Sequence, residues 1–260
     1  MSDLSLGPLA AALGLDRPQV AAIAGSGGKT TLQNALAAEL AGRGRVVAAT
    51  TTTHLYPPPA GLFPELWLWG QKIPGPDQVA RRLRAGRPLA LAAEKTLEGK
   101  LKGLSPEQVD VLARLPEVFV LVEADGAAGR PLKAWAAWEP VIPGQTCLLV
   151  VMAGASGLGR PLTPAWVHRP ELFAKASGLG LGEIITPKAL ARVLLGPEGP
   201  LRAKPADCRA VLVVNQADTV SQAQMTALKN ALTAAGGDKT PFAKILAGRL
   251  RWQGLGEMPA

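Results

Sequence analysis

The chain has 260 residues, of which 48% are hydrophobic, and its formal charge is +8. No apolar run approaches the roughly 18 residues of a transmembrane helix, and the N-terminal stretch carries acidic residues instead of the basic start of a signal peptide. The two cysteines, Cys147 and Cys208, lack the spacing of a zinc site or a disulfide framework. We therefore expect a cytoplasmic protein without membrane association.

The basic residues are scattered along the chain, with local clusters only at 80–87 and 247–252. A basic nucleic-acid module is one interpretation of this charge. Net charge bears first on solubility and non-specific binding, however. We expect no specific nucleic-acid partner, because an anionic small ligand such as a nucleotide accounts for the same excess.

Short apolar runs alternate with helical patterns along the chain. The first strand precedes a glycine cluster, and a helix that ends at Gly42 follows it. Ser105 and Gln108 form a predicted capping box, Thr186 is a predicted N-cap, and Gly236 follows the last helix. Strands are predicted at 20–24, 45–50, 66–69, 88–93, 118–124, 146–152, 209–215 and 242–246, and helices at 29–42, 105–115, after 186 and after 221. This alternation predicts one α/β domain over residues 1–260, with a mostly parallel sheet flanked by helices.

The glycine cluster between the first strand and helix is predicted to be a shortened phosphate-binding loop, with a glycine-rich turn and an incidental lysine as the alternative. The usual spacing of the P-loop requires a glycine where the chain has Ile23. The shorter form resembles the loop of the Mur-type peptide ligases. Backbone N–H groups and the helix N-terminus would bind phosphates, Lys29 would reach the outer phosphates, and the Thr30 hydroxyl would bind Mg²⁺. The sequence thus predicts a P-loop NTPase-like fold that binds Mg²⁺ and ATP or GTP through Gly25, Ser26, Gly27, Gly28, Lys29, Thr30 and Thr31.

Four threonines and a histidine follow the next strand. Threonine is common in strands for structural reasons. The carboxyl end of a strand beside a P-loop is, however, where ligands bind in open α/β sheets. We predict that Thr52 and Thr53 face the γ-phosphate or an acceptor. His54 is a candidate acid, base or substrate contact, with a structural role as the alternative.

Two carboxylates end the apolar run 118–124. Glu123 and Asp125 are two positions apart and therefore share a face of the strand. P-loop enzymes use such a carboxylate to hold the metal or to order its water. Asp125 is the first candidate and Glu123 the second. Arg130 and Lys133 follow and would pair with phosphate or an anionic substrate, unless they belong to a solvated turn.

The stretch Asn215-Gln216-Ala217-Asp218 resembles the N-K-x-D signature by which GTPases recognise guanine. Asn215 and Asp218 are therefore candidate base-binding residues. Gln216 replaces the signature lysine, so both GTP and ATP stay open. His168 and Arg169 precede a further helical stretch.

The order of these motifs, "GSGGKTT", "TTTTH", "EADGAAGRPLK", "EPVIP", "HRPELF" and "NQAD", resembles the YqeC family of selenium-dependent hydroxylase accessory proteins. The resemblance implies a cytoplasmic accessory role in maturing molybdenum hydroxylases that carry selenium. A molybdopterin-type cofactor or such a hydroxylase would be the partner. We expect nucleotide hydrolysis or transfer with Lys29, Asp125 and His54 as catalytic residues. A small-molecule kinase and a nucleotide-switched regulatory or chaperone GTPase are the alternatives.

Overall fold

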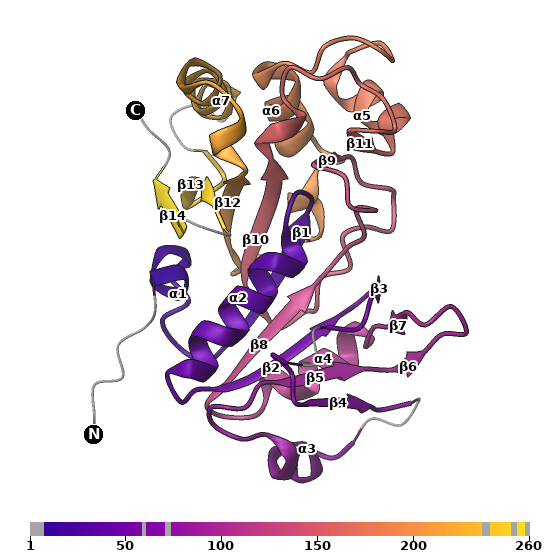
Figure 1. Ribbon diagram of the computed structural model, residues 1–260, viewed down its shortest axis with the longest axis vertical. Helices are drawn as coiled ribbons and strands as arrows, with labels where there is room; N and C mark the ends of the chain where they lie inside the picture. Colours follow the sequence, from indigo (N-terminus) through magenta and orange to yellow (C-terminus); the bar gives the residue numbers. More distant parts are fainter. Residues whose placement is uncertain (1–7, 59–60, 71–73, 236–239, 251–253, 258–260) are drawn as a thin grey trace.

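The computed structural model describes residues 8–58, 61–70, 74–235, 240–250 and 254–257. Its central feature is a nine-stranded sheet with the order β14-β13-β12-β10-β1-β8-β2-β5-β4 (Figure 1). Every neighbouring pair is parallel except β13 and β14. The strands are β1 (Val20–Gly25), β2 (Val46–Thr51), β4 (Glu65–Leu68), β5 (Leu89–Ala92), β8 (Val118–Glu123), β10 (Thr146–Gly154), β12 (Arg209–Asn215), β13 (Lys244–Arg249) and β14 (Gly254–Glu257).

Helices cover both faces of this sheet. Side chains that alternate along β1 face opposite ways: Ala21 and Ile23 pack with α1 and α2, whereas Ala22 and Ala24 pack in the cluster that includes α6 and α7. Helices α3 and α4 lie on the second face, beside β2 and β8. The helices are α1 (Pro8–Leu13), α2 (Lys29–Gly42), α3 (Pro76–Arg82), α4 (Pro106–Ala113), α5 (Pro170–Ser177), α6 (Pro187–Leu195) and α7 (Gln222–Ala235). This confirms the predicted α/β fold with a mostly parallel sheet, which is consistent with a P-loop NTPase-like fold.

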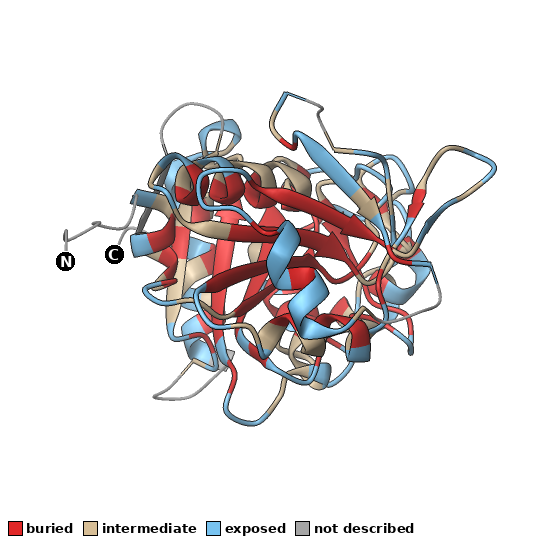
Figure 2. Cartoon of the chain, turned by 90° about the horizontal axis from the view of Figure 1, so that it is seen from below, coloured by how far each residue is buried: buried red, intermediate tan, exposed pale blue. Residues whose placement is uncertain are grey.

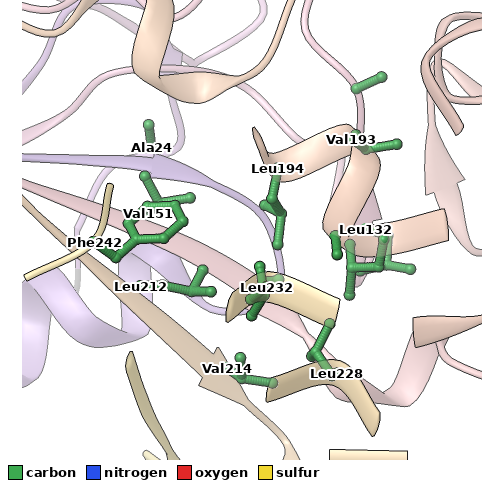
Figure 3. Packing of buried hydrophobic residues seen from close by; sticks show 14 of the residues in the cluster. Ala24, Leu132, Val151, Val193, Leu194, Leu212, Val214, Leu228, Leu232 and Phe242 are labelled. Atoms are coloured by element: carbon green, nitrogen blue, oxygen red, sulfur yellow. The ribbon is translucent and has the colours of Figure 1, made fainter. Parts of the chain in front are cut away.

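The three central strands of the sheet, β1, β8 and β10, are almost entirely buried (Figure 2). Every residue of β1 and β8 is buried, as strands covered on both faces should be. Figure 3 shows how Leu228 and Leu232 of α7 and Leu194 of α6 meet the sheet residues Val151 and Leu212. The carboxyl ends of these strands are therefore held on a rigid base.

Most predicted elements occur with small shifts at their ends. The capping box of α4 is confirmed, because Gln108 N donates to Ser105 Oγ at 3.3 Å and Ser105 N donates to Gln108 Oε1 at 2.8 Å. Thr186 caps α6 by accepting from Ala189 N at 3.2 Å. The strand predicted at 242–246 instead spans Lys244–Arg249. The glycines predicted to end α7 lie outside the described residues.

Two small sheets were not predicted, because strands of two residues carry no periodic pattern. One has the order β3-β7-β6, formed by His54–Leu55, Leu101–Lys102 and Glu94–Lys95. The other pairs β9 (Leu132–Lys133) with β11 (Val167–His168). Helices α1 and α3 and three short 3-10 helices, at Ala155–Gly157, Pro200–Ala203 and Ala217–Thr219, were also not predicted. None of the described helices is long and apolar enough to cross a membrane.

Candidate functional site

The glycine loop between β1 and α2 requires its glycines. Gly25, Gly27 and Gly28 have φ values of 101°, 78° and 132°, which side chains other than that of glycine rarely adopt. A Cβ at Gly25 would lie 2.1 Å from Met152 O, and one at Gly28 would lie 2.5 Å from Asn215 Nδ2. The loop can therefore pack this closely against β10 and β12 only with glycine at these positions.

The loop opens into a cleft of about 970 Å³ at the carboxyl edge of the sheet. The loop follows β1, which lies between β8 and β10. The strands β2, β5 and β4 lie on one side of β1 and the later strands β10, β12 and β13 on the other, so the direction in which the chain adds strands to the sheet reverses at β1. Ligands bind at such points in open α/β sheets. The structure brings most predicted residues together here: Gly27, Gly28, Lys29, Thr30, Thr31, His54, Glu123, Arg130, Asn215 and Asp218 all line the cleft.

Lys29 is buried at the base of the cleft and is held by its own loop. Its Nζ donates to Gly25 O at 2.8 Å. The same atom lies 3.5 Å from Glu123 Oε1 and 3.4 Å from Asp125 Oδ1. The ammonium group of Lys29 thus contacts two carboxylates. A phosphate ligand would take the place of part of these contacts.

Glu123 faces the cleft beside the start of α2. Thr30 Oγ1 donates to Glu123 Oε2 at 2.7 Å. Burial raises the pKa of Glu123 above its usual value of 4.5, although the nearby charge of Lys29 opposes this rise. The carboxylate is thus close to a cation and a hydroxyl but poorly solvated, a setting that favours an additional cation.

The Thr30 hydroxyl and the Glu123 carboxylate fit what Mg²⁺ requires of a protein. Mg²⁺ prefers oxygen ligands and usually takes one or two from the protein, with the rest from waters and substrate phosphates. The described residues contain no group of three or more His, Cys, Asp and Glu side chains that could hold a metal ion. The pair of oxygen donors beside the loop is the arrangement that a phosphate-bound magnesium ion would use.

Asp125, in contrast, is fully buried beneath the loop, with an exposed fraction of 0%. Gly25 N lies 3.0 Å from both carboxylate oxygens. Trp135 Nε1 donates to Asp125 Oδ2 at 2.6 Å, and Lys133 Nζ lies 3.1 Å from the same oxygen. Asp125 does not line the cleft. Its contacts hold the first residue of the glycine loop in place.

A chain of buried charges continues from Asp125 away from the loop. Lys133 Nζ lies 3.0 Å from Glu139 Oε2, and it also donates to Gly126 O at 2.6 Å. Both terminal nitrogens of Arg169 donate to Glu139. Burial lowers the pKa of Lys133, while Asp125 and Glu139 oppose this effect. The structure therefore corrects the expectation for Lys133, which lies neither in a solvated turn nor at the cleft.

The other predicted residues lie just outside this cleft. Ser26 is buried and donates to Pro131 O at 2.8 Å. Thr52 Oγ1 donates to Val141 O at 2.7 Å, and Thr53 Oγ1 lies 3.2 Å from Thr51 Oγ1. Thr52 and Thr53 line a second cavity of about 770 Å³ instead of the first cleft.

The stretch that resembles the guanine-recognition signature follows β12, on the other side of β1 from Glu123. Asn215 Nδ2 donates to Gly27 O at 2.7 Å, so this residue supports the glycine loop. Gln216 accepts from Ser156 Oγ at 2.6 Å. Asp218 Oδ2 lies 3.2 Å from an Arg249 nitrogen. Asp218 lines the cleft with a charged partner already in contact.

Several residues of the site carried no usable signal in the sequence. Trp135 lies between two of the quoted motifs without a recognisable pattern, and Glu139 begins the motif "EPVIP", whose role the sequence does not indicate. Glu139 contacts Arg169, and the pairing of β9 with β11 brings their two segments side by side. Arg249, at the end of β13, contacts Asp218, which lies just after the neighbouring strand β12. These contacts join segments far apart in the sequence, and no local spacing predicts them.

The sheet order, the glycine loop and the helix that starts at its lysine are those of an α/β protein of the P-loop type. A family model described as "YqeC protein" matches residues 21–171. "Uncharacterized protein YqeC" of Escherichia coli (strain K12) is 32% identical over 203 residues, which is 77% of each chain. The chain therefore belongs to the YqeC family. No solved structure matches it.

Proposed function

We propose that the protein binds a nucleoside triphosphate with Mg²⁺ in the cleft and catalyses hydrolysis of the nucleotide or transfer of its phosphoryl group. One observation carries this proposal: Lys29 and Thr30 begin α2 directly after a loop of glycines with positive φ, and Thr30 contacts Glu123. The loop, the helix start and the carboxylate meet in a cleft of about 970 Å³, within the size range of small-molecule sites.

The loop would bind the phosphates mainly through its backbone. N–H groups at the start of a helix attract phosphate oxygens, and the helix dipole adds to the attraction. Lys29 would move its contacts from Glu123 and Asp125 to the outer phosphates, which leaves Asp125 paired with Lys133. Lys29 would then stabilise the negative charge that develops on the transferred group.

We propose Glu123 instead of Asp125 as the carboxylate that serves the metal. Glu123 lines the cleft and already contacts Thr30. The oxygens of Asp125 are occupied by Gly25 N, Trp135 and Lys133, so it would have to give up buried contacts to reach a ligand. A bound Mg²⁺ would neutralise phosphate charge and orient the outer phosphates.

A phosphate-release assay with ATP and GTP tests the proposal. Wild type should release phosphate only with Mg²⁺, and Glu123→Gln should lower turnover about 10- to 100-fold, the usual cost of losing a residue that supports a metal. Glu117→Gln is the matched control, because Glu117 precedes the same strand at its opposite end and is exposed. Absence of Mg²⁺-dependent turnover and of nucleotide binding would contradict the proposal.

We also propose a cytoplasmic role in maturing selenium-containing molybdenum hydroxylases, with a molybdopterin-type cofactor or a hydroxylase as partner. What supports this role is membership of the YqeC family and the order of motifs along the chain. Deleting the gene in a host that makes such a hydroxylase should lower the activity and selenium content of the enzyme but not its amount. Wild type should restore both and Lys29→Met should not. Unchanged selenium content would contradict this role.

A further inference from the structure

We propose that the second cavity is the binding site for a phosphoryl acceptor, a small molecule with a planar ring and a negatively charged group. This acceptor chamber, of about 770 Å³, includes Thr52, His54, Trp138, His168 and Arg169 in its lining. The inference rests on the proposed nucleotide site and deepens it, because the acceptor would receive the phosphoryl group that water receives when no acceptor is bound.

The chamber adjoins the nucleotide cleft. His54, Gly126 and Ala128 line both cavities, so the two spaces meet beside the loop that follows Glu123. The chain has two histidines, and both His54 and His168 line the chamber although they are distant in sequence. In Figure 1, β3 and β7 lie on the same side of the molecule as β9, β11 and α5. A molecule in the chamber would thus lie next to the outer phosphates.

The charge of the chamber favours an anion. Helices α4 and α5, of eight residues each, begin there, since their N-cap residues Ser105 and Arg169 both line it. The N-terminus of a helix carries partial positive charge. Glu139 fixes the Arg169 guanidinium with two hydrogen bonds and is itself paired with Lys133. A guanidinium has five N–H donors, and three of those of Arg169 take no part in these two bonds.

An exposed tryptophan favours a planar ring. Trp138 lines the chamber and has an exposed fraction of 72%, which is high for so large an apolar side chain. The Arg169 guanidinium carbon lies 5.8 Å from the centre of its ring. Leu104 and Val141 add apolar lining. A flat ligand could stack on Trp138 while its anionic group meets Arg169.

The transfer balances without an additional reactant. A hydroxyl oxygen of the acceptor would form a bond to the γ-phosphorus, and the bond from that phosphorus to the bridging oxygen would break. The nucleoside diphosphate would leave with the electron pair, and the hydroxyl proton would pass to His54, which lines both cavities. Burial, together with the charges of Arg169 and Lys133, lowers the pKa of His168, so it is neutral near pH 7 and can hydrogen-bond to the acceptor.

Binding of the fluorescent probe 8-anilinonaphthalene-1-sulfonate tests the chamber, because this probe has planar rings and a negative charge. We expect saturable binding while a non-hydrolysable ATP or GTP analogue and Mg²⁺ fill the cleft. Trp138→Ala should weaken probe binding about tenfold, as expected for a lost stacking surface. The neutral analogue N-phenyl-1-naphthylamine should bind wild type about tenfold more weakly, because it lacks the charge.

Tyr56→Ala is the matched control. Tyr56 is 69% exposed, Lys100 Nζ lies 5.6 Å from the centre of its ring, and it lines the cleft but not the chamber. This variant should keep the wild-type affinity for the probe. Equal probe affinity in wild type and Trp138→Ala, or displacement of the probe by the nucleotide analogue, would overturn the inference. A calorimetric titration of nucleotide without the probe judges the proposed function separately.

Discussion

The two carboxylates that follow one another on β8 and its turn lie in different surroundings. One lines the cleft, and the other is buried beneath the glycine loop. Glu123 ends β8 and lines the cleft, where Thr30 and Lys29 contact it. Asp125, two residues further on, is buried beneath the loop, where it contacts Gly25, Trp135 and Lys133. A carboxylate with all its contacts inside the protein braces the loop, whereas one at the cavity surface can exchange contacts with a ligand.

The largest expected effect is a loss of stability in Asp125→Asn. The change removes the negative charge between Lys29 and Lys133 and leaves a buried network without its centre. Breaking a buried ion pair by removal of one partner costs about 3–5 kcal/mol in the free energy of unfolding. Chemical denaturation monitored by circular dichroism measures this loss.

Glu123→Gln is the control in the same experiment, and its unfolding free energy should stay within about 1 kcal/mol of wild type, since burial already disfavours the charged form of Glu123. An Asp125→Asn variant that is as stable as wild type and loses only Mg²⁺-dependent turnover would contradict the structural role of Asp125. Asp125 would then act in the cleft, as its position in the sequence first suggested.

A smaller effect concerns the pH dependence of Mg²⁺-nucleotide binding. In the proposed site the cation would bind the ionised form of Glu123, whose pKa burial raises above 4.5. Affinity should therefore be highest above that raised pKa and fall as the pH drops through it, by up to about tenfold per pH unit. Calorimetry over a pH series measures the slope. Glu123→Gln keeps the titration of the nucleotide itself, so identical slopes in the two proteins would exclude Glu123 from the metal site.

The smallest expected effect is on the choice of base. Asp218 would accept hydrogen bonds from guanine but not from adenine. Because the carboxylate is partly exposed and paired with Arg249, we expect a GTP preference of only about fivefold, near 1 kcal/mol. Asp218→Asn should lose this preference and gain xanthosine triphosphate binding, measured by competition titration. Equal affinity for ATP, or tighter binding of ATP, would remove Asp218 from the site.

The sequence predicted the parts of the molecule that local patterns define. Apolar runs such as Val118–Glu123 identified the buried strands, and glycines followed by Lys29 and Thr30 identified the loop and the start of α2. The capping box at Ser105 located α4 to within two residues. Each of these features depends on neighbours within a few positions of the chain.

The parts that could not be predicted depend on contacts between distant segments. Which of Glu123 and Asp125 faces the cleft is decided by the turn after β8 and by Trp135, which bonds Asp125 from ten residues further on. The pairing of β9 with β11 aligns Lys133, Glu139 and Arg169. Strands of two residues leave no periodic signal. The motifs that contain His54, Glu139 and Arg169 could therefore be recognised in the sequence, but their meeting in the acceptor chamber could not.

Calorimetric titration of Mg²⁺-ATP and Mg²⁺-GTP into wild type and Lys29→Met tests the central claim most directly. Lys29 supplies the only side-chain cation among the described residues of the glycine loop, Gly25–Thr30. The account predicts binding of at least one nucleotide to wild type with one site per chain. Lys29→Met should be less stable but stay folded, because Lys133 still pairs with Asp125. It should bind that nucleotide about 10- to 100-fold more weakly, the loss expected for a hydrogen bond to a charged group. Equal affinity in the two folded proteins would contradict the assignment of the loop as a phosphate site.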